Sequence, residues 1–229
     1  MMHFTVNRST LGRAWTPHFF VSIKVPKGKA LHQVATIRKE SVNPSLEPDK
    51  LFAHVSVPSI DQEKGCLDEI EYLHGSEIKG ARSRFNKGDI LYARIEPSIY
   101  NGKCAIVPDD IQEGVCSNEL YVVIPDNNLI LTEYLFYLLR SNLVLNQVFG
   151  RVTGSTGRGR LDVESFKEII LPVPDIREQK KIVGRLIELW TKVDELERKI
   201  QKLTNEVCNK MDSNIWKSAK TVIRKTSSK

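Results

Sequence analysis

The stretch PDIREQKKIVGRLIELWTKVDELERKIQKLTNEV, residues 174–207, carries the clearest structural pattern in this 229-residue chain. Asp175 and Glu178 have the types and the spacing of a helix N-cap and its N3 residue, so they predict a helix that begins after Pro174. Apolar residues then recur at alternating steps of four and three, which is the heptad pattern of a coiled coil. The predicted seam comprises Ile182, Leu186, Leu189, Val193, Leu196, Ile200, Leu203 and Val207.

An apolar seam this narrow must pack on another surface, because water would otherwise cover it. We expect pairing with a second helix; the alternative is that the helix lies on its own domain. Valine and isoleucine occupy most a positions and leucine most d positions, a preference of parallel pairs. Val183 and Trp190 at e positions widen the apolar face, which suggests a further partner or a contact with the globular part.

Upstream of this helix, short apolar and β-branched runs bounded by turn residues predict strands. Residues 131–149 predict two helical pieces that break near Ser141, with Thr132 as N-cap, and Asp162 is expected to cap a further short helix. IILPVP, residues 169–174, follows as a predicted strand. The other predicted strands are LHQVATI (31–37), LFAHVSV (51–57), DILYARI (89–95), KCAIVP (103–108) and ELYVVIP (119–125).

These patterns predict a mixed α/β fold of the α+β type, a globular domain followed by a long C-terminal coiled-coil helix. The expected boundaries are an N-terminal extension at 1–27, the domain at 28–174, the helix at 175–215 and a basic tail at 216–229. The extension contains one strand-like run, HFFVSIKVP, at 18–26.

The net charge of +6 is carried by one part of the chain. Residues 175–229 hold 14 Lys and Arg against 8 Asp and Glu, whereas residues 1–174 hold 20 of each, so the two parts are expected to have different partners. Four cysteines without a C-x-x-C pair, and five histidines without ligand spacing, argue against a metal site. With no signal-like or membrane-spanning apolar run, the chain is expected to be cytoplasmic.

Enzyme motifs are absent from the sequence. It contains no G-x-x-x-x-G-K-[ST] loop, no G-x-G-x-x-G fingerprint, no N-P-P-Y loop and no G-x-S-x-G elbow. Asp175, Glu178 and Lys180 superficially resemble the carboxylates and lysine of a metal nuclease, but helix capping explains the two acidic residues more simply. We therefore expect a binding protein, with a stand-alone nuclease as one alternative.

Three basic clusters point to nucleic acid as the ligand. They occur in KGARSRFNKGD (79–89), YARIEPSIYNGK (92–103) and GSTGRGR (154–160), which are expected to be loops and strand ends. Arginine and asparagine read base edges, lysine and small hydroxyls hold phosphates, and glycine-rich backbone amides approach phosphates closely. The predicted DNA contacts are Arg82, Arg84, Arg94, Asn101, Lys103, Ser155, Thr156, Arg158 and Arg160. The alternative for GSTGRGR is that it shapes the junction between domain and helix.

The order of segments resembles the specificity subunit of type I restriction–modification systems. The similarity covers about residues 31–210 and is most specific over VTGSTGRGRLDVESFKEIILPVPDIREQKKIVGRL, residues 152–186. The resemblance implies a non-catalytic protein whose target recognition domain reads half of a split double-stranded DNA site. It also implies that the helix is a spacer that pairs antiparallel with a second one and docks adenine methyltransferase subunits, for which Val183 and Trp190 are our candidates.

The chain departs from the family pattern in having one recognition domain and one helix, where a full specificity subunit carries two of each. It therefore resembles a half-subunit, a fragment, or a chain that pairs with another copy. Two copies related by a two-fold axis would read inverted half-sites. The resemblance implies that the chain needs no cofactor of its own, that S-adenosylmethionine binds the methyltransferase, and that a restriction motor subunit can join. The alternative within this family is an assembly or decoy protein that binds the methyltransferase without reading DNA.

Overall fold

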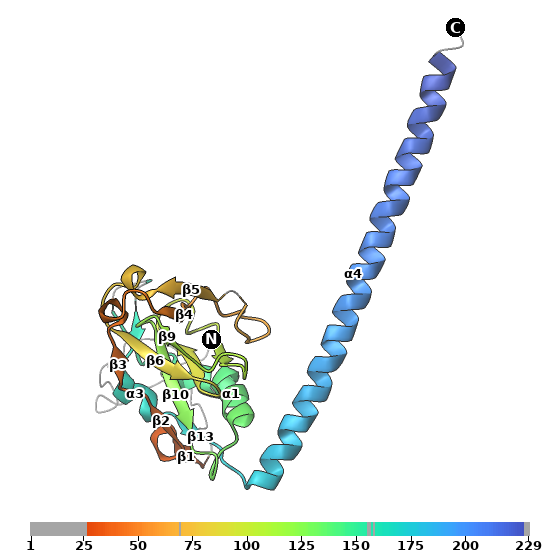
Figure 1. Cartoon of the computed structure of the whole chain (residues 1–229). Coiled ribbons are helices and arrows are strands. Elements are labelled where there is room, and N and C mark those ends of the chain that lie inside the picture. Colours follow the sequence, from red (N-terminus) through yellow and green to blue (C-terminus); the bar gives the residue numbers. More distant parts are fainter. Residues whose placement is uncertain (1–26, 69, 155–156, 158, 227–229) are drawn as a thin grey trace. The chain divides into compact units, whose positions relative to one another are not determined.

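The computed structural model describes residues 27–226 except 69, 155–156 and 158, and the side chains of these up to residue 211. The chain divides into two compact units, Met1–Lys180 and Lys181–Lys229. The first unit contains the strands and short helices, and the second is part of one long helix (Figure 1). The strand predicted at 18–26 lies outside the described residues. The mixed fold with a long C-terminal helix is confirmed.

Two sheets form the globular domain. The four-stranded sheet is antiparallel in the order β2-β10-β7-β8, and the five-stranded sheet has the order β3-β6-β9-β4-β5, in which only β4 and β9 pair in parallel. Two short pairs, β1 with β13 and β11 with β12, complete the described strands. Their bounds are β1 Lys29–Ala30, β2 Ala35–Ile37, β3 Ser41–Val42, β4 Leu51–Val55, β5 Glu71–His74, β6 Arg82–Asn86, β7 Ile90–Ala93, β8 Cys104–Ile106, β9 Glu113–Cys116, β10 Leu120–Pro125, β11 Val152–Thr153, β12 Arg160–Leu161 and β13 Ile170–Leu171.

The hydrophobic core joins the two sheets. All four residues of β7 are fully buried, as expected for a central strand that is covered on both faces. Leu91 of this strand and Val122 of β10 belong to one apolar cluster with Val55 of β4 and Phe85 of β6. The order of the predicted strands 51–57, 89–95, 103–108 and 119–125 is confirmed by β4, β7, β8 and β10.

Three predictions of local structure are only partly correct. The strand predicted at 31–37 is confirmed over β2, Ala35–Ile37, but not at its start. Residues 31–33 form a 3₁₀ turn, η3 (Leu31–Gln33), because the Gln33 side chain accepts a hydrogen bond from the Ala30 amide at 2.8 Å. The strand predicted at 169–174 is limited to β13, whose partner β1 has only two residues. The basic segment around Arg82 and Arg84 is a strand, not a loop, because β6 pairs with both β3 and β9 and buries Phe85 completely.

Short helices cover the domain. The predicted break is confirmed, since α1 (Thr132–Arg140) and α2 (Asn142–Val148) meet at Ser141. The predicted N-cap is wrong: Leu131 holds that position, and the Thr132 hydroxyl donates to Asn127 at 3.2 Å instead. The predicted cap of α3 (Val163–Lys167) is confirmed, with Asp162 Oδ1 accepting from the Ser165 amide at 2.8 Å. Two further 3₁₀ turns are η4 (Pro44–Leu46) and η5 (Gly75–Glu77).

The long helix α4 runs from Ile176 to Thr226. Asp175 Oδ1 accepts from the Glu178 amide at 3.0 Å, which confirms the predicted start. The helix continues beyond residue 215, where a basic tail was expected, because no glycine or proline follows Gly184 to interrupt it. At 1.5 Å per residue, its 51 residues correspond to about 76 Å, longer than a helix over 175–215 would be.

Candidate nucleic-acid interface

The Arg94 segment and the Arg160 segment lie side by side at the end of β7. Ile95 and Arg160 form an antiparallel bridge, the Leu161 amide donates to the Arg94 carbonyl at 2.9 Å, and the Glu96 amide donates to the Gly159 carbonyl at 3.0 Å. The structure thus brings together two of the three basic clusters that the sequence singled out, although Arg94 and Arg160 are 66 residues apart in the chain.

The carboxylate of Glu96 lies at the centre of this junction. Its Oε2 accepts hydrogen bonds from the amides of Gly157, at 3.1 Å, and Gly159, at 2.9 Å, and its Oε1 accepts from the Tyr100 hydroxyl at 2.8 Å. These donors, Tyr100 first, hold the pKa of Glu96 below its usual value, because each stabilises the ionised form. The two glycine amides are therefore bound to a protein carboxylate, and the expectation that loop amides approach phosphate does not hold for them.

The two arginines of this junction have different surroundings. The Arg94 guanidinium lies over the Tyr121 ring at 4.9 Å from its centroid, and the Tyr121 hydroxyl donates to the Leu161 carbonyl at 2.7 Å. The Arg160 side chain is 58% exposed, with Nη2 at 3.9 Å from a Glu119 carboxylate oxygen. A hollow lined by Ile95, Glu96, Glu119, Gly157 and Arg160 opens at this point. Arg160 is thus the described cation of this junction that is freest to reach a ligand.

The turn between β7 and β8 contains the other two predicted residues of this cluster. Asn101 is exposed, whereas Lys103 is half-buried and its Nζ donates to the Val57 carbonyl at 3.1 Å. Lys103 therefore holds the segment after β4 in place. Three further predicted contacts, Ser155, Thr156 and Arg158, lie outside the described residues.

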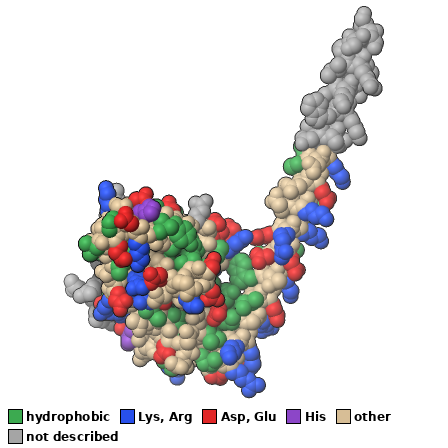
Figure 2. All heavy atoms as spheres, in the orientation of Figure 1, with side chains coloured by type: hydrophobic (Ala, Val, Ile, Leu, Met, Phe, Trp, Pro, Cys, Tyr) green, Lys and Arg blue, Asp and Glu red, His purple; other side chains and the backbone are tan. Residues whose placement is uncertain are grey.

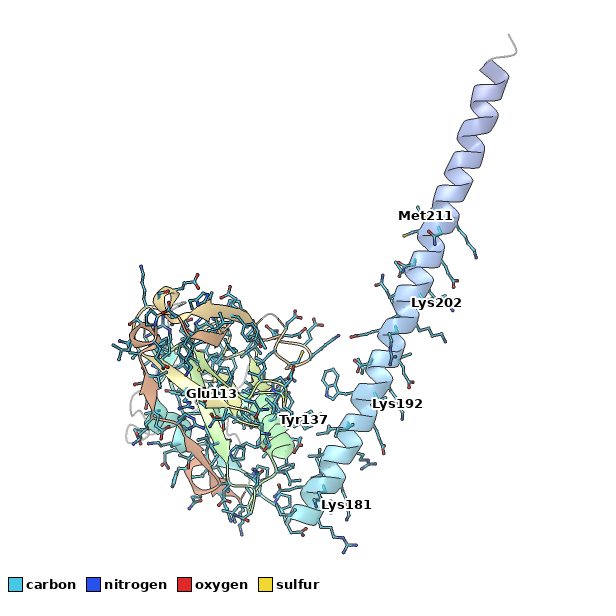
Figure 3. All side chains as sticks on the ribbon, in the orientation of Figure 1. Glu113, Tyr137, Lys181, Lys192, Lys202 and Met211 are labelled. Atoms are coloured by element: carbon cyan, nitrogen blue, oxygen red, sulfur yellow. The ribbon has the colours of Figure 1, made fainter. Side chains whose placement is uncertain are left out.

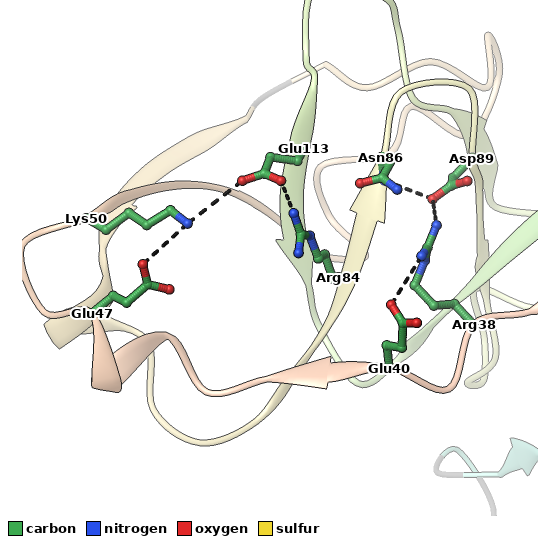
Figure 4. Close-up of polar contacts among 8 residues, drawn as sticks. All are labelled: Arg38, Glu40, Glu47, Lys50, Arg84, Asn86, Asp89 and Glu113. Carbon is green, nitrogen blue, oxygen red and sulfur yellow. Dashed lines mark hydrogen bonds and ion pairs between the residues drawn. The ribbon is translucent and has the colours of Figure 1, made fainter.

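Arg82 and Arg84 lie on β6 of the five-stranded sheet, whereas Arg94 follows β7 of the four-stranded sheet. The Arg84 guanidinium forms an ion pair with Glu113, whose other oxygen lies 3.8 Å from Lys50 Nζ (Figure 4). Arg82 Nη1 donates to the Ala81 carbonyl at 3.0 Å. Basic and acidic side chains are intermingled over the domain face seen in Figure 2, so Lys and Arg do not form one continuous positive patch on that face.

The seam of α4 faces solvent along most of its described length. Leu189, Val193, Leu196, Ile200, Leu203 and Val207 are between 39% and 63% exposed. Lys192, Lys202 and Met211 also project from this helix (Figure 3). Val183 is buried and Trp190 is half-buried. A row of large apolar side chains in water is costly, so this face is built to contact another surface.

A family model for the type I restriction modification DNA specificity domain matches residues 57–205, well over half of the chain. The chain belongs to this family. The EcoAI specificity subunit of Escherichia coli is 29% identical over 174 residues, which are 73% of this chain and 29% of that protein. The HindI specificity subunit of Haemophilus influenzae is 32% identical over 116 residues, 50% of this chain and 25% of that protein.

Solved structures give the same result for the fold. The HsdS subunit from Thermoanaerobacter tengcongensis matches with a TM-score of 0.67 and 25% identity, over 76% of this chain and 45% of that one. A chain from a study of assembly and conformational transition of the type I R-M system matches with a TM-score of 0.67 and 26% identity, over 76% of this chain and 45% of that one. This specificity-family chain therefore spans less than half the length of the relatives it matches.

Sequence reasoning missed the residue that anchors the start of α4. Gln179 is fully buried. Its Oε1 accepts from the Leu131 amide at 2.8 Å, and its Nε2 donates to the carbonyls of Leu129, at 3.0 Å, and Pro174, at 2.8 Å. A glutamine beside the predicted capping residues was the available signal, but two of its three partners, Leu131 and Leu129, lie 48 and 50 residues away in the sequence. Glu96 was missed for a related reason: a search for cations passes over a carboxylate.

Asp175, the first acidic residue of the nuclease alternative, uses its carboxylate to cap α4. Within the described residues, no three His, Cys, Asp or Glu side chains are grouped so that they could hold a metal ion. No helix in the part of the chain that the structure describes is long and apolar enough to cross a membrane.

Proposed function

We propose that this chain is the DNA-recognition subunit of a type I restriction–modification complex and has no catalytic activity of its own. The observation that carries the proposal is the family match over residues 57–205, which runs from the globular domain into the exposed seam of α4. In this proposal the domain reads one half of a bipartite double-stranded DNA site. Arg94, Asn101 and Arg160 at the β7 junction and Arg82 and Arg84 on β6 are its candidate DNA contacts.

We further propose that two copies pair through α4 and so present two recognition domains. Support comes from the exposed seam, whose large apolar side chains would be removed from water in such a pair. A two-fold pair would read two identical half-sites in inverted orientation, and the separation of those half-sites would follow from helix length. An antiparallel arrangement is the one we favour, because it sets the domains at opposite ends of the pair.

The remaining partners follow from the same proposal. A DNA adenine methyltransferase binds the helix side that carries Val183 and Trp190 and supplies S-adenosylmethionine, and a restriction motor subunit joins the complex when DNA is to be cleaved. A DNA-modifying complex of this kind works in the cytoplasm.

Purification of the tagged full chain from its native cells tests this function. We expect an adenine methyltransferase to be recovered at about two copies per complex, and the complex to methylate an interrupted inverted repeat, read by sequencing of modified bases. Recovery of a methyltransferase with no preferred DNA sequence would favour the assembly or decoy alternative. Metal-dependent cleavage by the chain alone, lost in Glu178→Ala, would favour the nuclease.

The pairing is tested with two double variants of α4. Leu196→Lys with Ile200→Lys places two charges in the seam, whereas Gln201→Lys with Asn205→Lys places two on exposed positions beside it. We expect light scattering to show a monomer for the first and a dimer for the second, because buried unpaired charges oppose association. A dimer in both would contradict pairing through this seam.

A further inference from the structure

The Glu96 carboxylate connects two segments that the proposed function assigns to DNA binding. Its hydrogen bonds to Gly157 and Gly159 are joined by the main-chain bond from the Glu96 amide to the Gly159 carbonyl at 3.0 Å. Gly159 is therefore held by Glu96 at both its N–H and its C=O. The next residue is Arg160, whose backbone bridges to Ile95.

Glu96 is itself held in place by Tyr100. The Tyr100 hydroxyl donates to Glu96 Oε1 at 2.8 Å, and the Tyr100 ring stacks on Phe149 with centroids 4.5 Å apart and planes 7° from parallel. Phe149 ends α2, so the carboxylate is connected to a helix of the domain through a rigid aromatic pair. Two carboxylate oxygens thus accept three hydrogen bonds, which restricts the rotation of the side chain.

Gly159 fits this arrangement because it has no side chain. A Cβ at this position would lie 2.5 Å from Val152 Cγ1 and 2.8 Å from Glu96 Oε2, which is closer than atoms in contact allow. The chain therefore approaches the carboxylate as closely as a glycine permits. The Arg160 side chain that follows is 58% exposed at the hollow shared with Glu96 and Glu119.

We propose that Glu96 is a positioning residue for DNA recognition, which fixes the backbone at Gly159 so that the Arg160 guanidinium is presented to the DNA. The inference rests on the proposed function. It adds Glu96, a negatively charged residue, to a set of DNA contacts that are otherwise positively charged or polar. Glu96 acts through Arg160 and does not touch the DNA itself.

The sign of the charge makes this inference testable. A carboxylate near DNA repels phosphate. If Glu96 were only a surface charge, removing its carboxylate would therefore strengthen DNA binding. If Glu96 positions Arg160, its removal weakens binding instead. Glutamine at this position retains a carbonyl that can accept from the glycine amides and an amide that can donate to the Tyr100 oxygen, so it should restore most of the affinity.

The experiment measures binding by the complex as it is purified from its native cells with the full chain. A duplex enriched from a random-sequence pool by the wild-type complex serves as the probe, at one fixed salt concentration. We expect Glu96→Ala and Arg160→Ala each to weaken binding by about tenfold, and Glu96→Gln to stay within about threefold of wild type. Glu63→Ala removes an exposed carboxylate in another loop and is the matched control, expected to leave binding unchanged or slightly tighter.

A double-mutant cycle separates positioning from general loss of structure. We expect Glu96→Ala to have no further effect when Arg160 is already alanine. Tyr100→Phe keeps the ring and removes only the hydroxyl, and it replaces Glu96→Ala in the cycle if that variant does not fold. Wild-type or tighter binding by Glu96→Ala, or an equal loss with and without Arg160, would overturn the inference. Failure of the wild-type complex to enrich any sequence would overturn the proposed function itself, and the inference with it.

Discussion

Replacing Gln179 by leucine removes one buried side chain that satisfies three main-chain groups. The Leu131 amide loses its acceptor, and the carbonyls of Leu129 and Pro174 lose a donor, while a side chain of similar size remains in the site. A buried group left without a partner costs about 1–3 kcal/mol. The amide should bear this cost in full and the carbonyls less, since each keeps a second lone pair, so we expect a loss of about 3 kcal/mol in the free energy of unfolding.

Scanning calorimetry of the full chain gives the direct measurement. For a chain of this length, 1 kcal/mol corresponds to about 2–4 °C in the midpoint, so the variant should unfold about 6–12 °C lower. Hydrogen exchange should report the same change at one site, with faster exchange of the Leu131 amide. Gln112→Leu is the matched control, because Gln112 is exposed and its side chain makes one hydrogen bond, to the Asp109 carbonyl at 2.8 Å. We expect this control to shift the midpoint by no more than about 2 °C.

Gln179→Glu adds a pH dependence to this test. The carboxylate can accept from the Leu131 amide, but it faces the carbonyls of Leu129 and Pro174 without a proton to donate. Protonation at low pH restores one donor, so this variant should recover part of its stability relative to Gln179→Leu as the pH falls. A midpoint for Gln179→Leu equal to that of the Gln112 control would refute the reasoning, since the three bonds would then contribute nothing measurable.

Variants at three further positions probe the junction and its neighbouring helix. Asp162→Ala removes the cap of α3 and should cost about 1 kcal/mol in urea unfolding, whereas Asp162→Asn should recover most of it; no loss in the alanine variant would contradict the capping role. The Cβ of alanine at position 159 would lie 2.5 Å from Val152 Cγ1, so Gly159→Ala should displace the backbone there and speed proteolysis near residue 159. Equal cleavage rates for the variant and the wild type would contradict this expectation. The pKa of Glu96 is lowered in the folded state, so its contribution is complete above its unfolded value of 4.5 and is lost as the pH falls through the lower, folded value. Glu96→Gln should therefore make the free energy of unfolding depend less on pH below about 4.5. A pH dependence equal to that of the wild type would contradict this role of the carboxylate.

The features that the sequence predicted correctly are local ones. The helix that begins after Asp175 depends on a cap three residues from its partner amide and on a short repeat, and the cap of α3 has the same spacing. Strand β7 is predictable because it is buried on both faces and so reads as a continuous apolar run. Strand β6 was not, since its arginines resemble a loop when its neighbours β3 and β9 are unknown.

The features that the sequence did not predict depend on contacts between distant segments. Glu96 meets Gly159 across 63 residues, and Gln179 meets the Leu131 amide across 48. Neither pairing follows from residue type, because glutamate and glutamine are usually surface residues. Only the fold determines that one is buried and that the other accepts three hydrogen bonds. The DNA-contact residues were chosen by charge alone, and charge did not separate Lys103, which binds a main-chain carbonyl, from Arg160, which is exposed.

Two of the arginines proposed to contact DNA are already paired with carboxylates in the free protein. Arg84 is bonded to Glu113, and Arg160 lies 3.9 Å from Glu119. A paired arginine must exchange its carboxylate for a phosphate or a base edge, so non-specific attraction to DNA is weaker than the number of arginines suggests. Binding is unfavourable wherever the guanidinium loses its carboxylate partner without gaining an equally good acceptor on the DNA. An incorrect DNA sequence offers fewer such acceptors, so the pairs weaken binding to incorrect sequences more than to the correct one. Residues 28–174, to which the proposal assigns DNA recognition, hold 16 Lys and Arg against 20 Asp and Glu and so carry a net charge of −4. A domain without excess positive charge can thus favour specificity over general affinity, whereas residues 175–229, which the proposal assigns to pairing and docking, carry a net charge of +6.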